Sequence, residues 1–473
     1  MLTDKSIKQL SAGLEKKEFS SRELLRECLA NIKKYDPLIN SIITLVDENE
    51  VMEKANVFDR EKDKLSVISG LPFVLKDAYV TKGIRTTSAS KVLKNYQPQY
   101  DATVYKKLVE NKAILLGKTN MDAWGHGGSS ENTDFNPVHN PWDTARVAGG
   151  SSGGAAAAVS SRMAVFAIGE DTGGSIRNPA AWCNISGLKV TYGRVSRYGS
   201  IAYASSFDTV GPMAKSAEDL AYILELIAGR DPYDATSSPQ VVKKYSQFLE
   251  KSINGLRIGL PLELFSKSLD KEIKETILKA TKIFTELGAE IVEVKMPIFD
   301  YGLAAYYLIA PSETSSNLAR YDGIRYGESR ENFTPETIRR IMVGTYALSA
   351  GYYDAYYRKA QQARTLFIKE YNNILSRCDV ILMPVNPTPP TKIGELINDP
   401  LQNLLADLFT VTQNPVGVPS LAIPCGFTKS NLPIGMQIIG KMFTEEKLLN
   451  IGYKFQQLTD WHIKKPPILN NDK

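Results

Sequence analysis

Apolar residues along the chain form short continuous runs that alternate with stretches of helical periodicity. Continuous runs occur at 71–80 (LPFVLKDAYV), 113–120 (AILLGKTN) and 163–171 (MAVFAIGED), and such text is typical of strands buried on both faces. The amphipathic stretch DATVYKKLVENK at 101–112 separates the first two runs. This alternation predicts an α/β protein built on a large mixed, largely parallel central β-sheet with helices on both faces.

The same alternation continues to the end of the chain. We expect one or two helices between Thr334 and Leu375, because Gly344 and Gly351 interrupt that segment. No internal repeat and no clear linker is visible, so we expect a single domain over 1–473. Further strands are predicted at 256–261, 289–297, 379–385, 420–426 and 434–440, and helices near 217–229, 270–287 and 445–458.

The residue pattern of the N-terminal part, 1–63, predicts helices. In SSRELLRECLANIKKY a serine precedes apolar residues at helical spacing, which is typical of an N-capped amphipathic helix. We therefore divide the expected domain into this helical part, a central region at 65–216 that holds two Gly-Gly-Ser turns, and the remainder at 217–473.

Composition restricts the class of protein. With 473 residues and 43% hydrophobic residues the chain is long and apolar enough to fold around a large core. A net charge of +5 is weak for this length and does not by itself indicate a nucleic-acid partner. The start, MLTDKSIKQL, lacks the apolar core of a signal peptide, and no apolar run approaches the ~20 residues of a membrane helix, so we expect a cytoplasmic protein.

The cysteines give no sign of a metal site or of a disulfide framework. They lie far apart and form no CxxC pair, which leaves reduced thiols as the simplest interpretation. The four are Cys28, Cys183, Cys378 and Cys425.

The glycine-rich stretch at 149–177, GGSSGGAAAAVSSRMAVFAIGEDTGGSIR, raises three interpretations. A flexible linker has polar neighbours, whereas AAAAV and MAVFAIG indicate burial. A phosphate-binding loop requires Lys and Ser or Thr after its last glycine, where this chain has Ala155 and Ala156. A catalytic scaffold requires a nucleophile, a base and donors for an oxyanion.

The second turn supplies a nucleophile and such donors. Ser175 follows GEDTGG directly after an apolar strand, and glycines let successive backbone N–H groups converge. The N–H groups of Thr172, Gly173, Gly174 and Ser175 are therefore candidates for holding a developing oxyanion.

The base is harder to assign, because the chain has only three histidines and His126 and His139 lie in loop-like text. Lys76 is the alternative, since it lies within the apolar run at 71–80, and burial lowers a lysine pKa toward that of a useful base. A strand lysine that points to solvent fits the same text, so both placements stay open.

In GGSSGG, DTGGSIR and the lysine-containing strand before them, the chain resembles the amidase signature family, because the three motifs agree in order and distance. The resemblance extends from the first helices to about residue 460 and implies the amidase-signature fold. It also implies a Ser–cis-Ser–Lys triad: Ser175 as nucleophile, Ser151 beside a cis peptide bond as proton relay, and Lys76 as base. Ser152 is expected to support the loop through hydrogen bonds.

Within that family, 312–327 and 338–365 resemble the A subunits of bacterial tRNA-dependent amidotransferases. That resemblance implies a glutamine pocket, with Arg340 for the carboxylate, Asp407 for the ammonium group and Tyr306 on the wall. Ala148 and Ala155 depart from the usual family text, and the segment from Tyr326 to Arg340 is shorter than in many members. No metal site is implied in this chain.

The resemblance also implies partners. This chain would hydrolyse glutamine, while a B subunit binds most of the tRNA and uses ATP and Mg²⁺ to activate Glu-tRNA(Gln) or Asp-tRNA(Asn), and a small C subunit joins the two. No cofactor is implied in this chain. Two alternatives stay open: a free-standing amidase that hydrolyses small or aryl carboxamides, and an inactive scaffold or RNA-binding subunit.

Overall fold

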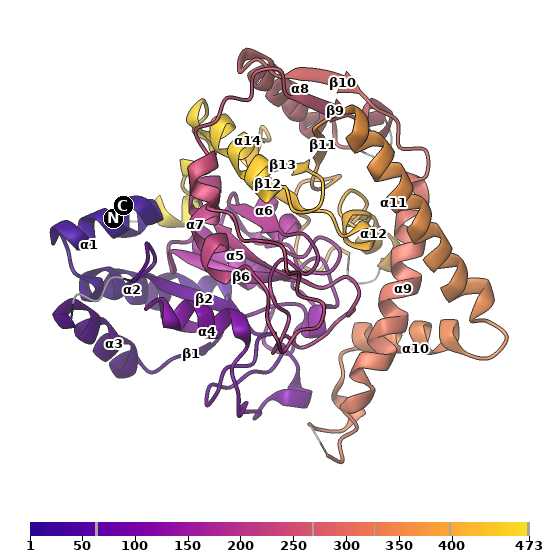
Figure 1. Cartoon of the computed structure of the whole chain (residues 1–473). Helices are drawn as coiled ribbons and strands as arrows, with labels where there is room; N and C mark the ends of the chain where they lie inside the picture. Colours follow the sequence, from indigo (N-terminus) through magenta and orange to yellow (C-terminus); the bar gives the residue numbers. More distant parts are fainter. Residues whose placement is uncertain (62–64, 267–268, 326, 397–398, 471–473) are drawn as a thin grey trace.

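The computed structural model describes residues 1–61, 65–266, 269–325, 327–396 and 399–470 (Figure 1). In the described part of the chain, an 11-stranded sheet has the order β1-β3-β2-β6-β8-β7-β12-β13-β11-β9-β10, and β4 and β5 form a separate hairpin. The strands are β1 Ile42–Leu45, β2 Pro72–Lys76, β3 Ile114–Thr119, β4 His139–Asn140, β5 Asp143–Val147, β6 Phe166–Asp171, β7 Ser186–Lys189, β8 Thr209–Ala214, β9 Arg257–Leu260, β10 Glu290–Glu293, β11 Val380–Pro384, β12 Ser420–Phe427 and β13 Pro433–Ile439.

The helices predicted in the N-terminal part and at 101–112, 217–229, 270–287, 334–375 and 445–458 are present, and the segment at 334–375 contains two, separated by a π-helical turn at Asp354–Arg358. The expectation that 1–63 is helical throughout is wrong, because this part also contains strand β1, and the long helix at Gly302–Asn317 is not predicted by the periodicity. The expected N-cap of the second helix is present, because the Ser20 side chain accepts a hydrogen bond from the Glu23 N–H. The α-helices are α1 Ile7–Lys16, α2 Ser21–Ile39, α3 Glu48–Glu61, α4 Thr103–Glu110, α5 Gly153–Ser160, α6 Arg177–Trp182, α7 Ala217–Ile227, α8 Lys271–Glu286, α9 Gly302–Asn317, α10 Pro335–Leu348, α11 Lys359–Arg377, α12 Pro400–Leu405, α13 Gln413–Val416 and α14 Glu445–Gln457.

The mixed sheet is confirmed, but the expectation that it is largely parallel is wrong. Strand β2 runs parallel to β3 and β6, and β9 runs parallel to β10 and β11. The other neighbouring strands of the sheet pair antiparallel. Antiparallel strands in the middle of this sheet are also covered on both faces, so their apolar text does not reveal their direction.

Helices cover both faces of the sheet. Leu421 and Ile423 of β12 face Gly452 of α14. On the neighbouring strand, Gly435 is opposite Pro424 and faces Ala181 of α6. Because successive strand residues point to opposite faces, α14 and α6 lie on opposite sides of the sheet.

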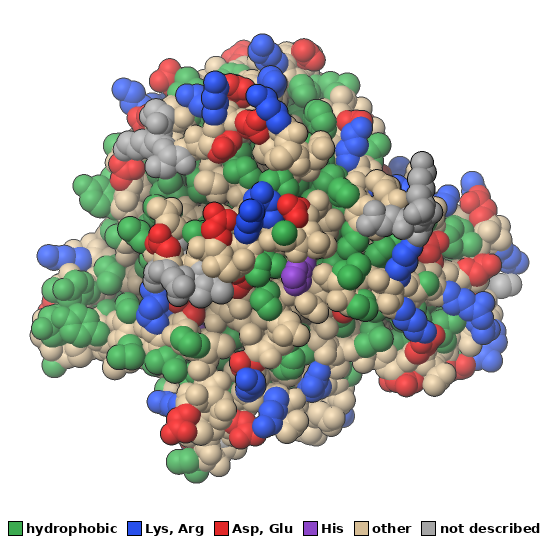
Figure 2. Space-filling view, turned by 180° about the vertical axis from the view of Figure 1, so that it is seen from behind, with side chains coloured by type: hydrophobic (Ala, Val, Ile, Leu, Met, Phe, Trp, Pro, Cys, Tyr) green, Lys and Arg blue, Asp and Glu red, His purple; other side chains and the backbone are tan. Residues whose placement is uncertain are grey.

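The helices α9, α10 and α11 lie together along one side of the molecule, at the right of Figure 1. Both ends of the described chain lie near α1, where Lys465 and Asp4 form an ion pair at 2.7 Å. Figure 2 shows that Lys and Arg side chains are interspersed with Asp and Glu over the opposite face, as the small net charge suggests.

Candidate active site

Lys76 is the last residue of β2, and its side chain is fully buried. Strand β2 lies inside the sheet, between β3 and β6. The Nζ atom of Lys76 lies 2.7 Å from Ser151 Oγ, 3.0 Å from Glu170 Oε2 and 3.2 Å from the Glu170 carbonyl oxygen. Of the two placements that the sequence leaves open, the structure has the buried one, and it puts a lysine nitrogen in direct contact with a serine hydroxyl.

The first Gly-Gly-Ser turn places Ser151 beside that lysine. The peptide bond between Gly150 and Ser151 is cis, as the family resemblance implies. A Cβ atom on Gly150 would lie 2.0 Å from Asp122 Oδ2, so only glycine fits this turn. Ser152 supports the loop as expected, since its hydroxyl donates to the Glu170 carbonyl oxygen at 3.1 Å.

The second turn places Ser175 next to the first. The carbonyl oxygen of Ser175 accepts a hydrogen bond from the Ser152 N–H at 3.1 Å. Residue Ser175 is 7% exposed, whereas Ser151 is fully buried. Helix α5 follows the first turn directly and α6 follows the second. Buried helices at these positions exclude the linker interpretation of the glycine-rich stretch.

A buried ion pair holds the second turn. Arg177 donates to both carboxylate oxygens of Asp171, each at 3.0 Å. Burial alone would raise the pKa of Asp171, but the guanidinium holds it below its usual value. The Gly174 N–H donates to Asp171 Oδ1 at 2.9 Å. Of the four expected oxyanion donors, Gly174 is thus already engaged, and the expectation narrows to the amides of Thr172, Gly173 and Ser175.

The predicted substrate residues lie close together near this turn. Tyr306, on α9, packs against Gly173, where a Cβ would approach the Tyr306 ring to 2.5 Å. The Arg340 guanidinium, on α10, lies over the Tyr307 ring at 5.4 Å, and the Tyr307 hydroxyl donates to Asp407 Oδ2 at 2.7 Å. Tyr307 therefore connects the expected carboxylate-binding and ammonium-binding residues, although no pattern in the sequence distinguishes it from Tyr306.

Arg340 lines a cavity of about 350 Å³, together with Gly128, His126 and Tyr307. The guanidinium donates to Glu336 Oε1 at 2.7 Å and to the Tyr203 hydroxyl. Helix α10 begins at Pro335, so Arg340 is placed in the cavity despite the short preceding segment. Tyr326, the other end of that segment, lies outside the described residues.

The electrostatics of the cavity follow from burial. Burial raises the pKa of the Asp407 carboxyl to about 6. Burial, together with the charge of Arg340, lowers the pKa of His126 well below its usual value. The His126 ring lies between the hydroxyls of Thr314 and Thr337, each at 3.2 Å, so this histidine lines the cavity as a neutral side chain.

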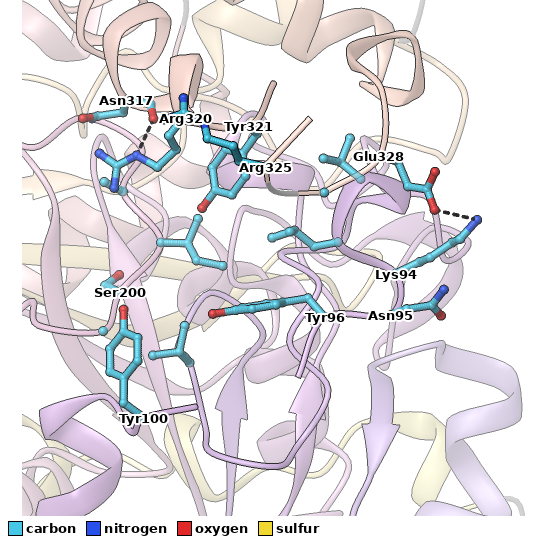
Figure 3. A pocket seen from close by; sticks show the side chains of 17 residues that line it. Lys94, Asn95, Tyr96, Tyr100, Ser200, Asn317, Arg320, Tyr321, Arg325 and Glu328 are labelled. Carbon is cyan, nitrogen blue, oxygen red and sulfur yellow. Dashed lines mark hydrogen bonds and ion pairs between the residues drawn. The ribbon is translucent and has the colours of Figure 1, made fainter. Parts of the chain in front are cut away.

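A second cavity, of about 690 Å³, contains none of the predicted site residues (Figure 3). Tyr96, Tyr100 and Tyr321 lie on its walls. Charged groups on the walls have partners: Lys94 pairs with Glu328 at 3.3 Å. Its composition therefore points to no particular ligand.

Two further properties concern the described residues only. They contain no cluster of three or more His, Cys, Asp or Glu side chains arranged to hold a metal ion. Among them, none of the helices combines the length and the apolar character that a membrane span requires.

Comparison with known proteins places this geometry in context. The family described as Amidase matches residues 23–449. The chain is 48% identical to the A subunit of the glutamyl-tRNA(Gln) amidotransferase from Sulfurihydrogenibium sp., over 99% of this chain and 100% of that protein. The crystal structure of the A subunit of the Thermotoga maritima glutamyl-tRNA(Gln) amidotransferase is similar with a TM-score of 0.83 and 39% identity, covering 95% of this chain and 94% of the other. A bacterial aryl acylamidase of the amidase signature family has a TM-score of 0.88 and 26% identity, covering 99% of each chain.

Proposed function

The chain belongs to the amidase family, and we propose that it is the glutamine-hydrolysing A subunit of a tRNA-dependent amidotransferase. It supplies ammonia for the amidation of Glu-tRNA(Gln), Asp-tRNA(Asn) or both; the names of its relatives favour the first. The observation that carries this proposal is that Tyr307 contacts both Arg340 and Asp407, while Thr410 joins Asp407 to the turn that holds Ser175, through hydrogen bonds to the carbonyl oxygens of Asp407 and Gly173.

The proposed reaction uses the Lys76–Ser151 contact as a proton relay. Ser151 passes its proton to Lys76 and receives the proton of Ser175, whose Oγ attacks the side-chain amide carbon of glutamine. The amides of Thr172, Gly173 and Ser175 hold the oxyanion. The relayed proton then returns to the departing nitrogen, ammonia leaves, and water hydrolyses the acyl-enzyme.

Substrate recognition rests on charge. The Arg340 guanidinium suits the α-carboxylate of glutamine, because its planar fork forms two parallel hydrogen bonds. Asp407 accepts the α-ammonium group, and Tyr306 packs against Gly173 of the second turn. A bound glutamine would thus present its side-chain amide to Ser175.

The partners follow from the same proposal. A B subunit holds the tRNA and uses ATP and Mg²⁺ to activate the carboxylate that the ammonia attacks, and a C subunit joins it to this chain. We propose that the whole chain, 1–473, forms one amidase-signature domain within this complex.

The test is an amidation assay on the assembled complex. The chain is co-expressed with candidate B and C subunits, and glutamine-dependent amidation of glutamyl-tRNA is compared with amidation from added ammonia. The Ser175→Ala variant should lose the use of glutamine and keep the use of ammonia. Normal amidation from glutamine by this variant would refute the proposal.

A free-standing amidase for small or aryl carboxamides is the second candidate, favoured by the similarity to the aryl acylamidase structure. This function predicts rapid hydrolysis of anilides by the isolated chain and no effect of Arg340→Ala. Glutamine turnover that depends on Arg340 decides between the two candidates.

A further inference from the structure

Glu170 is a buried carboxyl group in contact with the expected base, Lys76. The proposed proton relay through Ser175, Ser151 and Lys76 assigns no role to it. It lies on β6, is 3% exposed, and its Oε2 is 3.0 Å from Lys76 Nζ. With Ser151 Oγ and the Glu170 carbonyl oxygen, Nζ has three oxygen neighbours within hydrogen-bond distance. An ammonium ion would donate to all three oxygens, whereas a neutral amine would donate to the two Glu170 oxygens and accept from the Ser151 hydroxyl. The contacts fit both forms, and a proton relay through Ser151 requires the neutral one, with its lone pair toward Ser151.

The other carboxylate oxygen of Glu170 leads, through Thr172, to a second buried carboxyl group. Thr172 Oγ1 contacts Glu170 Oε1 and also lies 2.7 Å from Asp208 Oδ1. A threonine hydroxyl has one proton and can donate to only one of two carboxylates. The second contact is a hydrogen bond only if one carboxyl group is protonated and donates to the hydroxyl oxygen. The geometry therefore indicates that Glu170, Thr172 and Asp208 already share one extra proton.

The surroundings of Asp208 act on its proton in opposite directions. Its two oxygens accept the backbone N–H groups of Ala204, at 2.9 Å, and of Tyr203, at 3.1 Å, and these bonds favour the carboxylate. Burial, and then the charge of Glu170, raise the pKa of Asp208 to about 8. Other titratable or charged groups that act on Lys76, Glu170 or Asp208 include Tyr79, Asp122 and Arg197.

We propose that Glu170 is a positioning residue that takes up a proton from Lys76 and so supplies the neutral amine on which the serine relay depends. This inference rests on the proposed function, in which Lys76 is the base. With one proton on Asp208, transfer from Lys76 Nζ to Glu170 Oε2 leaves three neutral groups and exchanges no proton with solvent.

The step balances. One N–H bond of Lys76 breaks, its electron pair stays on Nζ, and an O–H bond forms at Glu170 Oε2. Nζ then accepts the Ser151 proton while Ser151 accepts that of Ser175, and the Ser175 Oγ–carbon bond forms as the carbonyl electron pair moves to oxygen. Collapse of the intermediate returns the relayed proton through Ser151 to the departing nitrogen, and Glu170 keeps its proton throughout.

The test measures how the activation of Ser175 depends on pH. The rate of labelling by a fluorophosphonate is recorded for the full chain and for Glu170→Gln, which preserves the shape of the side chain but cannot accept the proton. In the wild type the proton moves within the cluster, so the rate should be nearly constant between about pH 6 and 8. In Glu170→Gln the ammonium loses its proton only to solvent, so the rate should fall about tenfold for each pH unit by which the solution is made more acidic.

A matched control comes from the neighbouring strand. Lys118 and Asp77 form another buried pair, with Nζ and Oδ1 3.4 Å apart and both side chains fully buried. Asp77→Asn removes a buried carboxylate from a lysine outside the serine chain. It should lower the melting temperature and leave the shape of the pH profile unchanged.

The opposite profile would overturn the proposal. If Glu170 only pairs with the ammonium ion, the wild-type rate rises tenfold per pH unit between about pH 6 and 8, and Glu170→Gln moves that rise to lower pH. If Glu170→Gln does not fold, the wild-type profile alone still decides, because a slope near one in this range contradicts internal transfer.

This experiment is independent of the substrate. Fluorophosphonate labelling measures the reactivity of the nucleophilic serine in any amidase. A protein that does not hydrolyse glutamine can therefore still give the expected pH profiles. Failure of the proposed function takes a different form: labelling that persists in Ser175→Ala or in Lys76→Ala would refute the triad itself.

Discussion

Replacing Arg340 by alanine tests substrate recognition most directly. The side chain is 7% exposed, and two of its five N–H groups are engaged by Glu336 and by the Tyr203 hydroxyl. Among the described residues, no other acceptor takes a hydrogen bond from Arg340, which leaves its remaining N–H groups for a substrate carboxylate. Arg340→Ala therefore leaves the carboxylate of a bound glutamine buried without its cation.

The expected loss of kcat/KM is large because Arg340 and the glutamine carboxylate would form a pair that is shielded from water. Removing one partner of a buried, hydrogen-bonded charge pair costs about 2–5 kcal/mol. We take about 3 kcal/mol, since Tyr203 and Tyr307 keep part of the polar environment. At about 1.4 kcal/mol per factor of ten, kcat/KM for glutamine should fall about 100-fold.

The assay compares two substrates and two variants. Butyramide has the amide but no charged groups, so its hydrolysis should be unaffected by Arg340→Ala. Arg339, the preceding residue, is 40% exposed and pairs with Glu336 at 2.7 Å. Its replacement by alanine should change kcat/KM for glutamine less than about fivefold. An equal loss for glutamine and butyramide in Arg340→Ala would refute carboxylate recognition and indicate a structural role.

Three other outcomes follow from the site. Because the pKa of Asp407 is raised to about 6, the carboxylate is lost as pH falls through that value, and kcat/KM for glutamine should drop there. Glutaramate, which lacks the ammonium group, should not show this drop, and a drop common to both substrates would contradict ammonium binding by Asp407. Gly150→Ala places a Cβ 2.0 Å from Asp122 Oδ2 and should shift Ser151, lowering kcat about 100-fold; an unchanged kcat in a folded variant would show that the turn tolerates the methyl group. Arg177→Met leaves Asp171 buried without its cation, which should lower the free energy of unfolding by about 3–5 kcal/mol in denaturant titrations. Adding Asp171→Asn should restore part of that free energy. Equal stability of the single and double variants would contradict a stabilising ion pair.

The sequence alone determined most elements of the fold, since each element reflects local chemistry. A continuous apolar run such as 71–80 predicts a buried strand, and Ser20 before a helical apolar pattern predicts an N-cap. Strands with weaker patterns were missed: Ser186–Lys189 and Thr209–Ala214 contain glycine or polar residues, yet the sheet buries them completely. Their position between β6 and β12 is decided by packing across the sheet.

The candidate site divides in the same way. Motifs of neighbouring residues single out Lys76, Ser151 and Ser175, because tight glycine turns have a local signature. The contacts of Lys76 with Glu170, 94 positions away, and of Tyr307 with Asp407, 100 positions away, have none. They exist because β2 lies beside β6 and because α9 packs beside the second turn. The sequence thus determined which groups can react, and the tertiary structure decided which charges surround them, since electrostatic interactions depend on distance in space and not along the chain.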